Sequence, residues 1–598
     1  MNNGHTFHIP VLGIGFSVDT PLKVSHLGID SVMSICDDML LEKLRKMYSD
    51  KFKLHYDEIT DKVQDFRAKR ITAYLDLMNQ MVDSNIEEVK DSLSTNYDKV
   101  KDYIKNLPEA SAMKQDFEEL VNKHLSINKV KEWVSDKLQK GSLDVNIMTK
   151  VDRDNYVDGE KLPIEFNDAH AAVRGFANST LESAVILSAG MSPRLYSYLA
   201  QFEDFYPSKT GYIKKKIILK VSDYRSALIQ GQFLAKKGIW VSEYRVESGL
   251  NCGGHAFATE GHLIGPILED FKTKRDELTQ TVFETLKRAL EAQEREVPEE
   301  VLSLKVSAQG GVGTNEEHEF LLEHYNVDSV GWGTPFLLVP EVTNVDQPTI
   351  DKLIGAREED LYLSGISPLG VPFNNLRDNT KDIEKLGLME KGRPGSSCPK
   401  KYLALDKSYN EEGMCTASRQ FQHLKLKELE EADISKEEYN AEYEKITEKA
   451  CICTGLGTSA LLNNDIETSK EGAGISVCPG PNMAYFSKQM SLNEMVNHIY
   501  GRLDVISRDD RPNMYLKELS LYVDYLKKQV GSVLLKASPK DEKKLIKFAN
   551  NLQAGIVYYQ EMFEKNLEVF KGNIKQNLDS LKAFSTQINV IVLPLNID

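Results

Sequence analysis

The sequence predicts an α/β protein built around a TIM (β/α)8 barrel, with a helical insertion after strand 2 and a mainly helical C-terminal extension. Three observations predict this fold. Short runs rich in β-branched residues alternate with helical stretches, eight such runs can be counted, and the segments that contain them have the size of one barrel.

The eight candidate strands follow one another within the first 345 residues. They are residues 11–14, 30–35, 144–149, 184–188, 217–221, 239–248, 304–308 and 328–332. Residues 1–40 and 141–345 together approach the roughly 250 residues that a TIM barrel needs. A long outer helix is expected over Ile267–Gln293, where apolar residues recur at helical spacing.

Three further segments complete the expected organisation. Residues 41–140 are rich in Lys, Glu, Asp and Leu and nearly free of Gly and Pro, which predicts a helical insertion. Residues 346–485 are rich in Gly, Pro and Cys without clear periodicity, and we expect them to wrap the barrel or form a small unit. Residues 486–598 are expected to be helical, with helices over Tyr515–Val530 and Asp541–Phe570 and a break at Pro539.

Composition limits the classes of partner. A formal net charge of −16 argues against nucleic acid or an anionic membrane as the main partner, because phosphate-backbone binding needs clustered Lys and Arg. No apolar run approaches a bilayer span, and the first residues do not read as a secretory signal. Seven cysteines in a long chain do not suggest a secreted disulfide framework. We expect a cytoplasmic protein that acts on a small molecule.

Two Gly-rich loops follow the last two predicted strands. The first is Gln309–Thr314, with Gly310 and Gly311, and the second is Gly331–Phe336, with Gly333 and Thr334. Glycines there leave backbone N–H groups able to face phosphate oxygens, and a helix starting at Asn315 would add the positive end of its dipole. The loops predict a pocket for a phosphorylated cofactor, with ordinary strand-to-helix turns as the alternative.

A third motif, Gly253-Gly254-His255, comes after the sixth predicted strand. Glycines permit close approach of the backbone to a flat ligand, and a histidine exchanges protons near neutral pH. We therefore predict a catalytic loop with His255 as the reactive group. The alternative is a Gly-rich turn whose histidine packs or caps.

These three motifs, in this order, resemble the nitronate monooxygenase family, also called 2-nitropropane dioxygenase-like, whose members are TIM-barrel flavoproteins carrying FMN. Pro10–Gly15 also resembles the family's first strand and flavin-side loop. The resemblance covers only the barrel. Two residues depart from the family pattern, because Cys252 stands where alanine is common and Asn251 where an acidic residue is common.

The resemblance implies particular roles for seven residues. Gly310, Gly311, Gly333 and Thr334 would bind the FMN phosphate, Gly13 and Ser188 would lie near the isoalloxazine ring, and His255 would act as general acid or base. The family also includes enoyl reductases, so we expect an FMN-dependent oxidoreductase for a small nitronate, enoyl or carbonyl-type substrate. A reductase would also need an electron donor, either NAD(P)H or a ferredoxin-like protein.

Five cysteines gather in the Gly- and Pro-rich segment, in turn-like contexts. They are Cys398, Cys415, Cys451, Cys453 and Cys478. Four thiolates would satisfy zinc or an iron–sulfur cluster. No CxxC pair is present, however, and buried cysteines acting as small hydrophobic residues are the alternative.

Two other functions stay open. The barrel could be a non-catalytic scaffold whose helical regions mediate homo-oligomerisation or partner binding. It could also bind another phosphorylated ligand, because Gly-rich loops after the last two strands serve many barrel enzymes. Residues Asn374, Asn375 and Arg377 are candidates for covering the mouth of the site, or for a simple surface turn.

Overall fold

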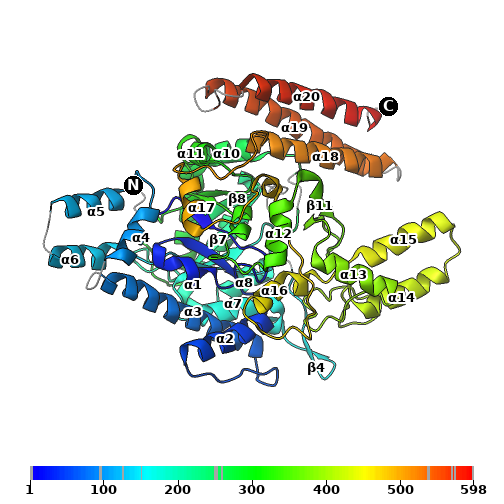
Figure 1. Cartoon of the computed structure of the whole chain (residues 1–598), viewed down its shortest axis with the longest axis horizontal. Coiled ribbons are helices and arrows are strands. Elements are labelled where there is room, and N and C mark those ends of the chain that lie inside the picture. The colour runs from blue at the N-terminus through cyan, green and yellow to red at the C-terminus, as the bar shows by residue number, and fades with distance from the viewer. Residues whose placement is uncertain are drawn as a thin grey trace.

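A computed structural model describes residues 4–92, 97–123, 127–149, 151–247, 253–256, 260–534, 539–566, 570 and 574–595. Eight parallel strands close into a barrel in the order β1-β10-β9-β8-β7-β6-β3-β2 (Figure 1). Their bounds are β1 Phe7–Ile9, β2 Asp30–Ser34, β3 Leu143–Asn146, β6 Ser183–Leu187, β7 Lys215–Val221, β8 Val241–Glu247, β9 Lys305–Gln309 and β10 Ser329–Gly331. The predicted TIM barrel is confirmed.

Seven of the predicted strands overlap observed ones, but the prediction for the first strand is wrong. Strand β1 ends at Ile9, and the predicted stretch 11–14 is the loop that follows it. Pro10 has no N–H to donate to a ladder, and Gly13 has a φ of +56°, so this stretch turns out of the sheet. The true strand has only three residues, too few to show an alternating pattern.

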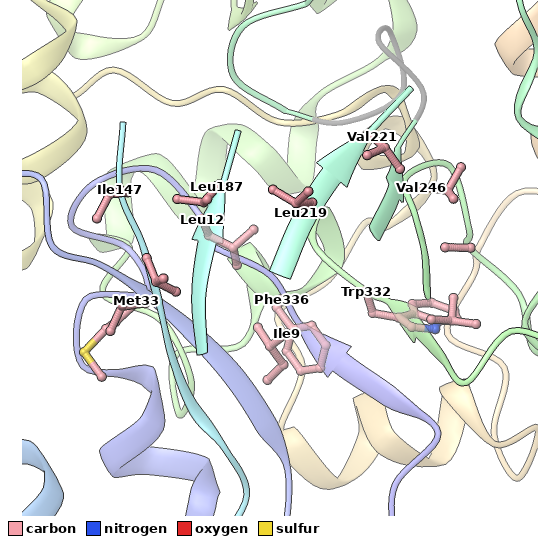
Figure 2. Packing of buried hydrophobic residues seen from close by; sticks show 14 of the residues in the cluster. Ile9, Leu12, Met33, Ile147, Leu187, Leu219, Val221, Val246, Trp332 and Phe336 are labelled. Carbon is pink, nitrogen blue, oxygen red and sulfur yellow. The ribbon is translucent and has the colours of Figure 1, made fainter. Parts of the chain in front are cut away.

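Side chains alternate along each strand between the helix-facing core and the barrel interior. The helix-facing residues belong to the main hydrophobic core, part of which appears in Figure 2 with Leu187, Leu219 and Val246 labelled. The period of two then places Lys220 and Glu247 on the opposite, interior face. The interior is therefore partly charged near the carboxyl ends of β7 and β8.

The segment between β2 and β3 is helical, as expected. Its helices are α2 Asp38–Phe52, α3 Phe66–Asp91, α4 Asp98–Asn106, α5 Ala112–Asn122 and α6 Ile127–Lys137. Helix α3 packs in the main core through Ile71, Tyr74 and Met78, so it covers the barrel itself. Helices α4 to α6 form a separate small core with the end of α3 around Val100, Phe117 and other apolar residues.

The remaining barrel helices are α1 Thr20–Val24, α7 Asp168–Ala177, α8 Pro193–Leu199, α9 Tyr224–Ala235, α10 Ile264–Ala292 and α11 Asn315–Tyr325. The long helix α10 corresponds to the one predicted over 267–293, and it buries Phe271, Leu278, Leu286 and further residues of that stripe. A hairpin of β4 Tyr156–Val157 and β5 Glu160–Lys161 lies outside the barrel (Figure 1).

The Gly-, Pro- and Cys-rich segment contains more helix than its pattern suggested. It holds α12 Gln347–Gly355, α13 Thr380–Glu390, α14 Arg419–Glu430, α15 Lys436–Glu448 and α16 Ile452–Leu462, and the hairpin of β11 Leu361–Ser364 with β12 Phe373–Leu376. Helices α14 and α15 lie side by side and project from the body (Figure 1). Helix α16 is buried on all sides, so it shows no amphipathic period.

The C-terminal region is helical, as expected. It comprises α17 Leu492–Ile499, α18 Met514–Leu534, α19 Pro539–Lys565 and α20 Ile574–Val592. Helices α18 to α20 pack together, and α19 contacts α10 on the barrel (Figure 1). Pro539 is the first residue of α19, which ends before the predicted Phe570. In the part of the chain that the structure describes, no helix has the length and apolar character needed to cross a bilayer.

Candidate functional site

A cavity of about 230 Å³ lies at the carboxyl ends of the barrel strands. This is the face at which TIM barrels carry their active sites. Strand-end residues from β2, β3, β7, β8, β9 and β10 line it, namely Ser34, Asn146, Lys220, Glu247, Gln309 and Gly331. Apolar residues of the loop after β1 form another wall, among them Val11, Leu12 and Ile14.

The cavity brings together most of the residues predicted from the sequence. Gly13, Gly310, Gly311, Gly333, Thr334 and His255 all line it. Ser188 directly follows β6 but is not among the lining residues. Asn251 and Cys252 lie outside the described residues. The roles that the resemblance assigns to these residues stay predictions.

Within the described residues, the two Gly-rich loops contain backbone N–H groups that have no hydrogen-bond acceptor. Gly310 and Gly311 have φ values of +104° and +85°, which favour glycine. Among the hydrogen bonds of the described residues, none uses the N–H groups of Gly310, Gly311, Gly333 or Thr334. Backbone N–H groups in such loops are suited to phosphate oxygens. These residues therefore fit a phosphate group.

Helix α11 begins at Asn315 as expected, but the Glu317 carboxylate already lies at the positive, N-terminal end of the helix. Gly313 N–H donates to Glu317 Oε2 at 2.9 Å, and both carboxylate oxygens of Glu317 accept from Arg511 at 2.8 Å. The Glu317 side chain is buried. A phosphate would therefore be held by the loop N–H groups, and the expected contribution of the α11 dipole is taken up within the protein.

Residues of the segment 346–485, called the extension below, cover part of the cavity. Gly480 N–H donates to Thr334 Oγ1 at 2.9 Å, and Asn482 Nδ2 donates to the carbonyls of Gly311 and Val312 at 2.6 and 2.9 Å. Helix α16 crosses the loop after β1, where Gly15 N–H donates to Leu456 O at 2.8 Å. The extension thus connects the two Gly-rich loops and the loop after β1 in one site.

The loop of Gly253 and Gly254 is held by the extension as well. A Cβ on Gly253 would lie 2.2 Å from the Cys478 carbonyl oxygen, so only glycine fits there. Asn374 donates to the Gly254 carbonyl with its backbone N–H at 2.8 Å and its side-chain Nδ2 at 3.2 Å. Asn374 therefore holds the loop of Gly253 and Gly254, but Asn374, Asn375 and Arg377 are not among the residues that line the cavity, so their predicted role in covering its mouth stays a prediction.

His255 lines the cavity, and two residues of the extension orient it. Its Nε2 lies 2.7 Å from the hydroxyl oxygen of Ser367, and its ring packs edge-on against Phe373 with centroids 5.0 Å apart. Ser367 is fully buried and its hydroxyl accepts the Leu369 N–H at 3.2 Å. That hydroxyl can donate its own proton to Nε2, which places the imidazole proton on Nδ1.

Sequence reasoning missed several polar side chains of the cavity as site residues, among them a connected group of Lys220, Glu247 and Gln309. Lys220 forms an ion pair with Glu247, and Gln309 Nε2 donates to Glu247 Oε1 at 3.0 Å. The signal was present in the sequence, since a lysine interrupts the apolar strand β7 one residue before its end. A charge at that position points into the barrel mouth when the neighbouring residues point outward.

The predicted cysteine cluster lies partly at the main cavity. The half-buried Cys478 and the buried Cys453 both line that cavity. Cys398, Cys415, Cys451 and Cys453 lie close to one another, with Cys451 in the centre. The neighbouring Cys398 thiol lowers the pKa of Cys451 to about 6, and Cys451 in turn raises the pKa of Cys398. Burial raises the pKa of Cys453.

The described residues contain no group of three or more His, Cys, Asp or Glu side chains placed to hold a metal ion. The zinc or iron–sulfur interpretation of Cys398, Cys415, Cys451, Cys453 and Cys478 stays a prediction.

The fold and the cavity define a TIM-barrel protein whose C-terminal segment closes the mouth of the barrel. No protein-family model and no curated protein matches the sequence. Among solved structures, the crystal structure of the enoyl reductase domain of MlnA from the macrolactin biosynthesis cluster from Bacillus amyloliquefaciens is similar. The identity is 14% and the TM-score 0.30, over 66% of this chain and 85% of that chain. A similarity of this size carries no argument about function.

Proposed function

We propose that this protein is an FMN-dependent oxidoreductase acting on a small nitronate, enoyl or carbonyl-type substrate. One observation supports the proposal: a histidine and four residues whose backbone N–H groups have no acceptor in the described part of the chain line the same cavity, at the face where TIM barrels carry their active sites. The donors of Gly310, Gly311, Gly333 and Thr334 would hold the FMN phosphate. When bound, FMN supplies reversible two-electron chemistry.

The walls of the cavity suit a flat ring with one polar edge. Val11, Leu12 and Ile14 form an apolar side, and Gly13 takes a left-handed conformation among them. On the opposite strands, Lys220 provides a positive charge that Glu247 and Gln309 hold in place. Such an arrangement would hold a flat ring against the apolar side, with the Lys220 ammonium group beside it.

His255 would transfer a proton to or from a substrate carbon. Imidazole is suited to this because its ordinary pKa lies near neutral pH. The hydrogen bond between Nε2 and the Ser367 hydroxyl, together with the packing of Phe373 against the ring, fixes the orientation of the imidazole. The role of His255 can be tested separately from that of the backbone N–H groups in the Gly-rich loops. His255 would act on the substrate, and the N–H groups would bind the phosphate.

The proposal is tested with a pair of variants at Gly333. A Cβ there would meet only Pro10 and Leu12 at 3.3 and 3.5 Å, so a side chain can be accommodated with slight adjustment. Gly333→Glu places a carboxylate beside the phosphate donors, and Gly333→Gln places a neutral group of the same shape. We expect FMN affinity to fall by at least about tenfold more in Gly333→Glu than in Gly333→Gln.

Activity is then followed with an alkyl nitronate under oxygen and with an enoyl thioester plus NADPH or a reduced ferredoxin. Equal FMN affinity in the two Gly333 variants would remove the phosphate site from the proposal. FMN binding without turnover of any of these substrates would support the scaffold alternative. Selective binding of a sugar phosphate in place of FMN would favour another phosphorylated ligand.

A further inference from the structure

A second cavity, of about 1010 Å³, lies at the surface between helix α14 and the segment that precedes it. Four permanently cationic side chains line it, namely Arg393, Lys401, Arg419 and Lys427. Two carboxylates, those of Glu412 and Glu430, also line it. The whole chain has a formal net charge of −16, so this excess of positive charge is local to the cavity.

These charges are not neutralised by ion pairs. Among the residues that the structure describes, none of the six side chains lies within ion-pair distance of an opposite charge. Lys425 of α14 does not line the cavity, and its ammonium group lies 2.8 Å from the Glu428 carboxylate. Arg419 Nε is buried and has no hydrogen-bond acceptor in the described part of the chain. A buried donor without an acceptor costs free energy, so the cavity is suited to an anion that accepts from Arg419.

The basic side chains follow one face of α14. Arg419, His423 and Lys427 are spaced by four residues and all line the cavity. At about 1.5 Å per residue, they are spread over roughly 12 Å of the helix axis. Arg393 and Lys401 line the cavity from the connection between α13 and α14. Positive charge is therefore distributed along the cavity and does not converge on one point.

Backbone contacts hold the two walls of this cavity together. Gly395 has a φ of +84°, and a Cβ there would lie 2.7 Å from the Arg419 backbone, so only glycine fits. Arg419 N–H donates to Ser396 O at 3.0 Å, and Ser396 N–H donates to Ala417 O at 3.0 Å. The first turn of α14 and the opposite loop are thereby fixed relative to each other before any ligand binds.

We propose that this cavity binds an organic phosphate of nucleotide size that carries two or more phosphate groups. Phosphate suits the site because arginine and lysine form charge-assisted hydrogen bonds with its oxygens. More than one phosphate group is favoured because the cations are spread over successive turns of α14. The cavity is much larger than a phosphate ion, and Met414 and Leu426 offer apolar contact to the organic part of the ligand.

The first measurement is a calorimetric titration of the purified full-length protein with adenosine, AMP and ADP, which share one nucleoside and differ in their phosphate groups. We expect affinity to increase in that order, with ADP bound at least about thirtyfold more tightly than adenosine. Added salt should weaken the binding of ADP, because it screens the exposed cations. Equal affinities for the three ligands, or no binding of ADP, would overturn the proposal.

Charge-matched variants locate the site. Arg393→Gln with Lys427→Gln removes two cations of the cavity and should lower ADP affinity by about tenfold or more. Lys425→Gln with Lys445→Gln removes two cations that do not line the cavity and should change ADP affinity by less than about twofold. An equal loss in the two double variants would reflect general charge attraction, and the assignment of the site would be wrong.

Arg419→Met separates a role in binding from a role in folding. The variant should lower ADP affinity by about tenfold or more. It should not lower the melting temperature of the ligand-free protein, because a buried Nε without an acceptor does not stabilise the fold. A lower melting temperature with unchanged ADP affinity would show that Arg419 is structural and would contradict the site.

Two further outcomes would assign another place or another partner. Gly333→Glu alters the main cavity and should leave ADP affinity unchanged, because Gly333 does not line the second cavity. A loss of ADP binding in that variant would place ADP in the main cavity. A polyglutamate peptide that binds more tightly than ADP would make the second cavity a docking site for an acidic protein segment. Either result would overturn the proposal.

Discussion

His255 Nε2 lies 2.7 Å from Ser367 Oγ, so the loop after β8 and the C-terminal extension meet at the residue most suited to proton transfer. Ser367 is fully buried, and it belongs to the connection between β11 and β12. The extension therefore does more than cover the barrel, because it supplies the partner that orients the candidate catalytic imidazole.

Replacing Ser367 with Ala should lower turnover by about tenfold while leaving FMN binding unchanged, because one hydrogen bond that orients His255 is lost. Ser364→Ala is a matched control, since its hydroxyl bonds the Phe373 carbonyl at 2.9 Å in the same hairpin and does not touch His255. Steady-state rates and an FMN titration measure the two effects. If both serine variants lose the same activity, Ser367 has no specific role.

His255→Asn should reduce turnover by roughly a hundredfold or more, because the amide cannot exchange a proton near neutral pH. The side chain keeps a hydrogen-bonding group, so the loop of Gly253 and Gly254 should stay in place. FMN affinity is the internal control and should change little. Turnover equal to that of the unmodified protein would remove His255 from the mechanism.

A buried ion pair beside the cavity should be important for stability. Lys400 and Asp37 are each 1% exposed, and Tyr402 donates to Asp37 at 3.0 Å. Lys400→Met should destabilise the fold by about 3–5 kcal/mol, because it leaves a buried carboxylate without its partner. Urea unfolding measures the loss.

The surface pair of Lys425 and Glu428, 44% and 53% exposed, provides the control for that experiment. Lys425→Met should cost less than about 1 kcal/mol. The double variant Asp37→Asn with Lys400→Met should recover part of the lost stability. A loss in Lys400→Met no larger than in Lys425→Met would show that the buried pair does not matter.

Asp144 should make stability depend on pH at the base of the barrel. Burial, and then the nearby charge of Asp30, raise the pKa of Asp144 to about 6. Because the folded state binds this proton more tightly than the unfolded state, the contribution of Asp144 to stability falls as pH rises through about 6. Above that pH the buried carboxylate costs up to about 3 kcal/mol.

Asp144→Asn removes this cost and keeps an acceptor for the Ala184 N–H, which lies 3.1 Å from Asp144 Oδ1. The melting temperature of the variant, relative to the unmodified protein, should therefore rise more at pH 8 than at pH 5. Asp61→Asn, at an exposed position, should show no such difference. A gain in Asp144→Asn that is the same at both pH values would contradict the assigned pKa.

The barrel could be predicted from the sequence because most of its strands are runs of β-branched and apolar residues, as in Ile217–Leu219. The first strand was predicted at the wrong residues because β1 has only three residues, too few to show the alternation of a strand. Helix α16 was missed because it is buried on all sides and so lacks a period.

Residues of the candidate site could be predicted only where they belong to one short motif in the sequence. Gly310, Gly311, Gly333 and His255 belong to short Gly-rich motifs that a linear reading finds. Ser367, which contacts His255, and Asn482, which lines the cavity, come from distant parts of the chain, and nothing near them in sequence marks these contacts. The cysteines were found as a group, but which of them line the main cavity depends on how the extension folds.

The central claim is that the Gly-rich loops bind the phosphate of a flavin nucleotide, and comparing FMN with riboflavin tests it most directly. The two ligands share the same ring and differ by the phosphate. Titration of the full-length protein, followed by flavin fluorescence, should show FMN binding at least about a hundredfold more tightly than riboflavin, because charge-assisted hydrogen bonds from backbone N–H groups are strong. Equal affinities, or no binding of either ligand, would contradict the account.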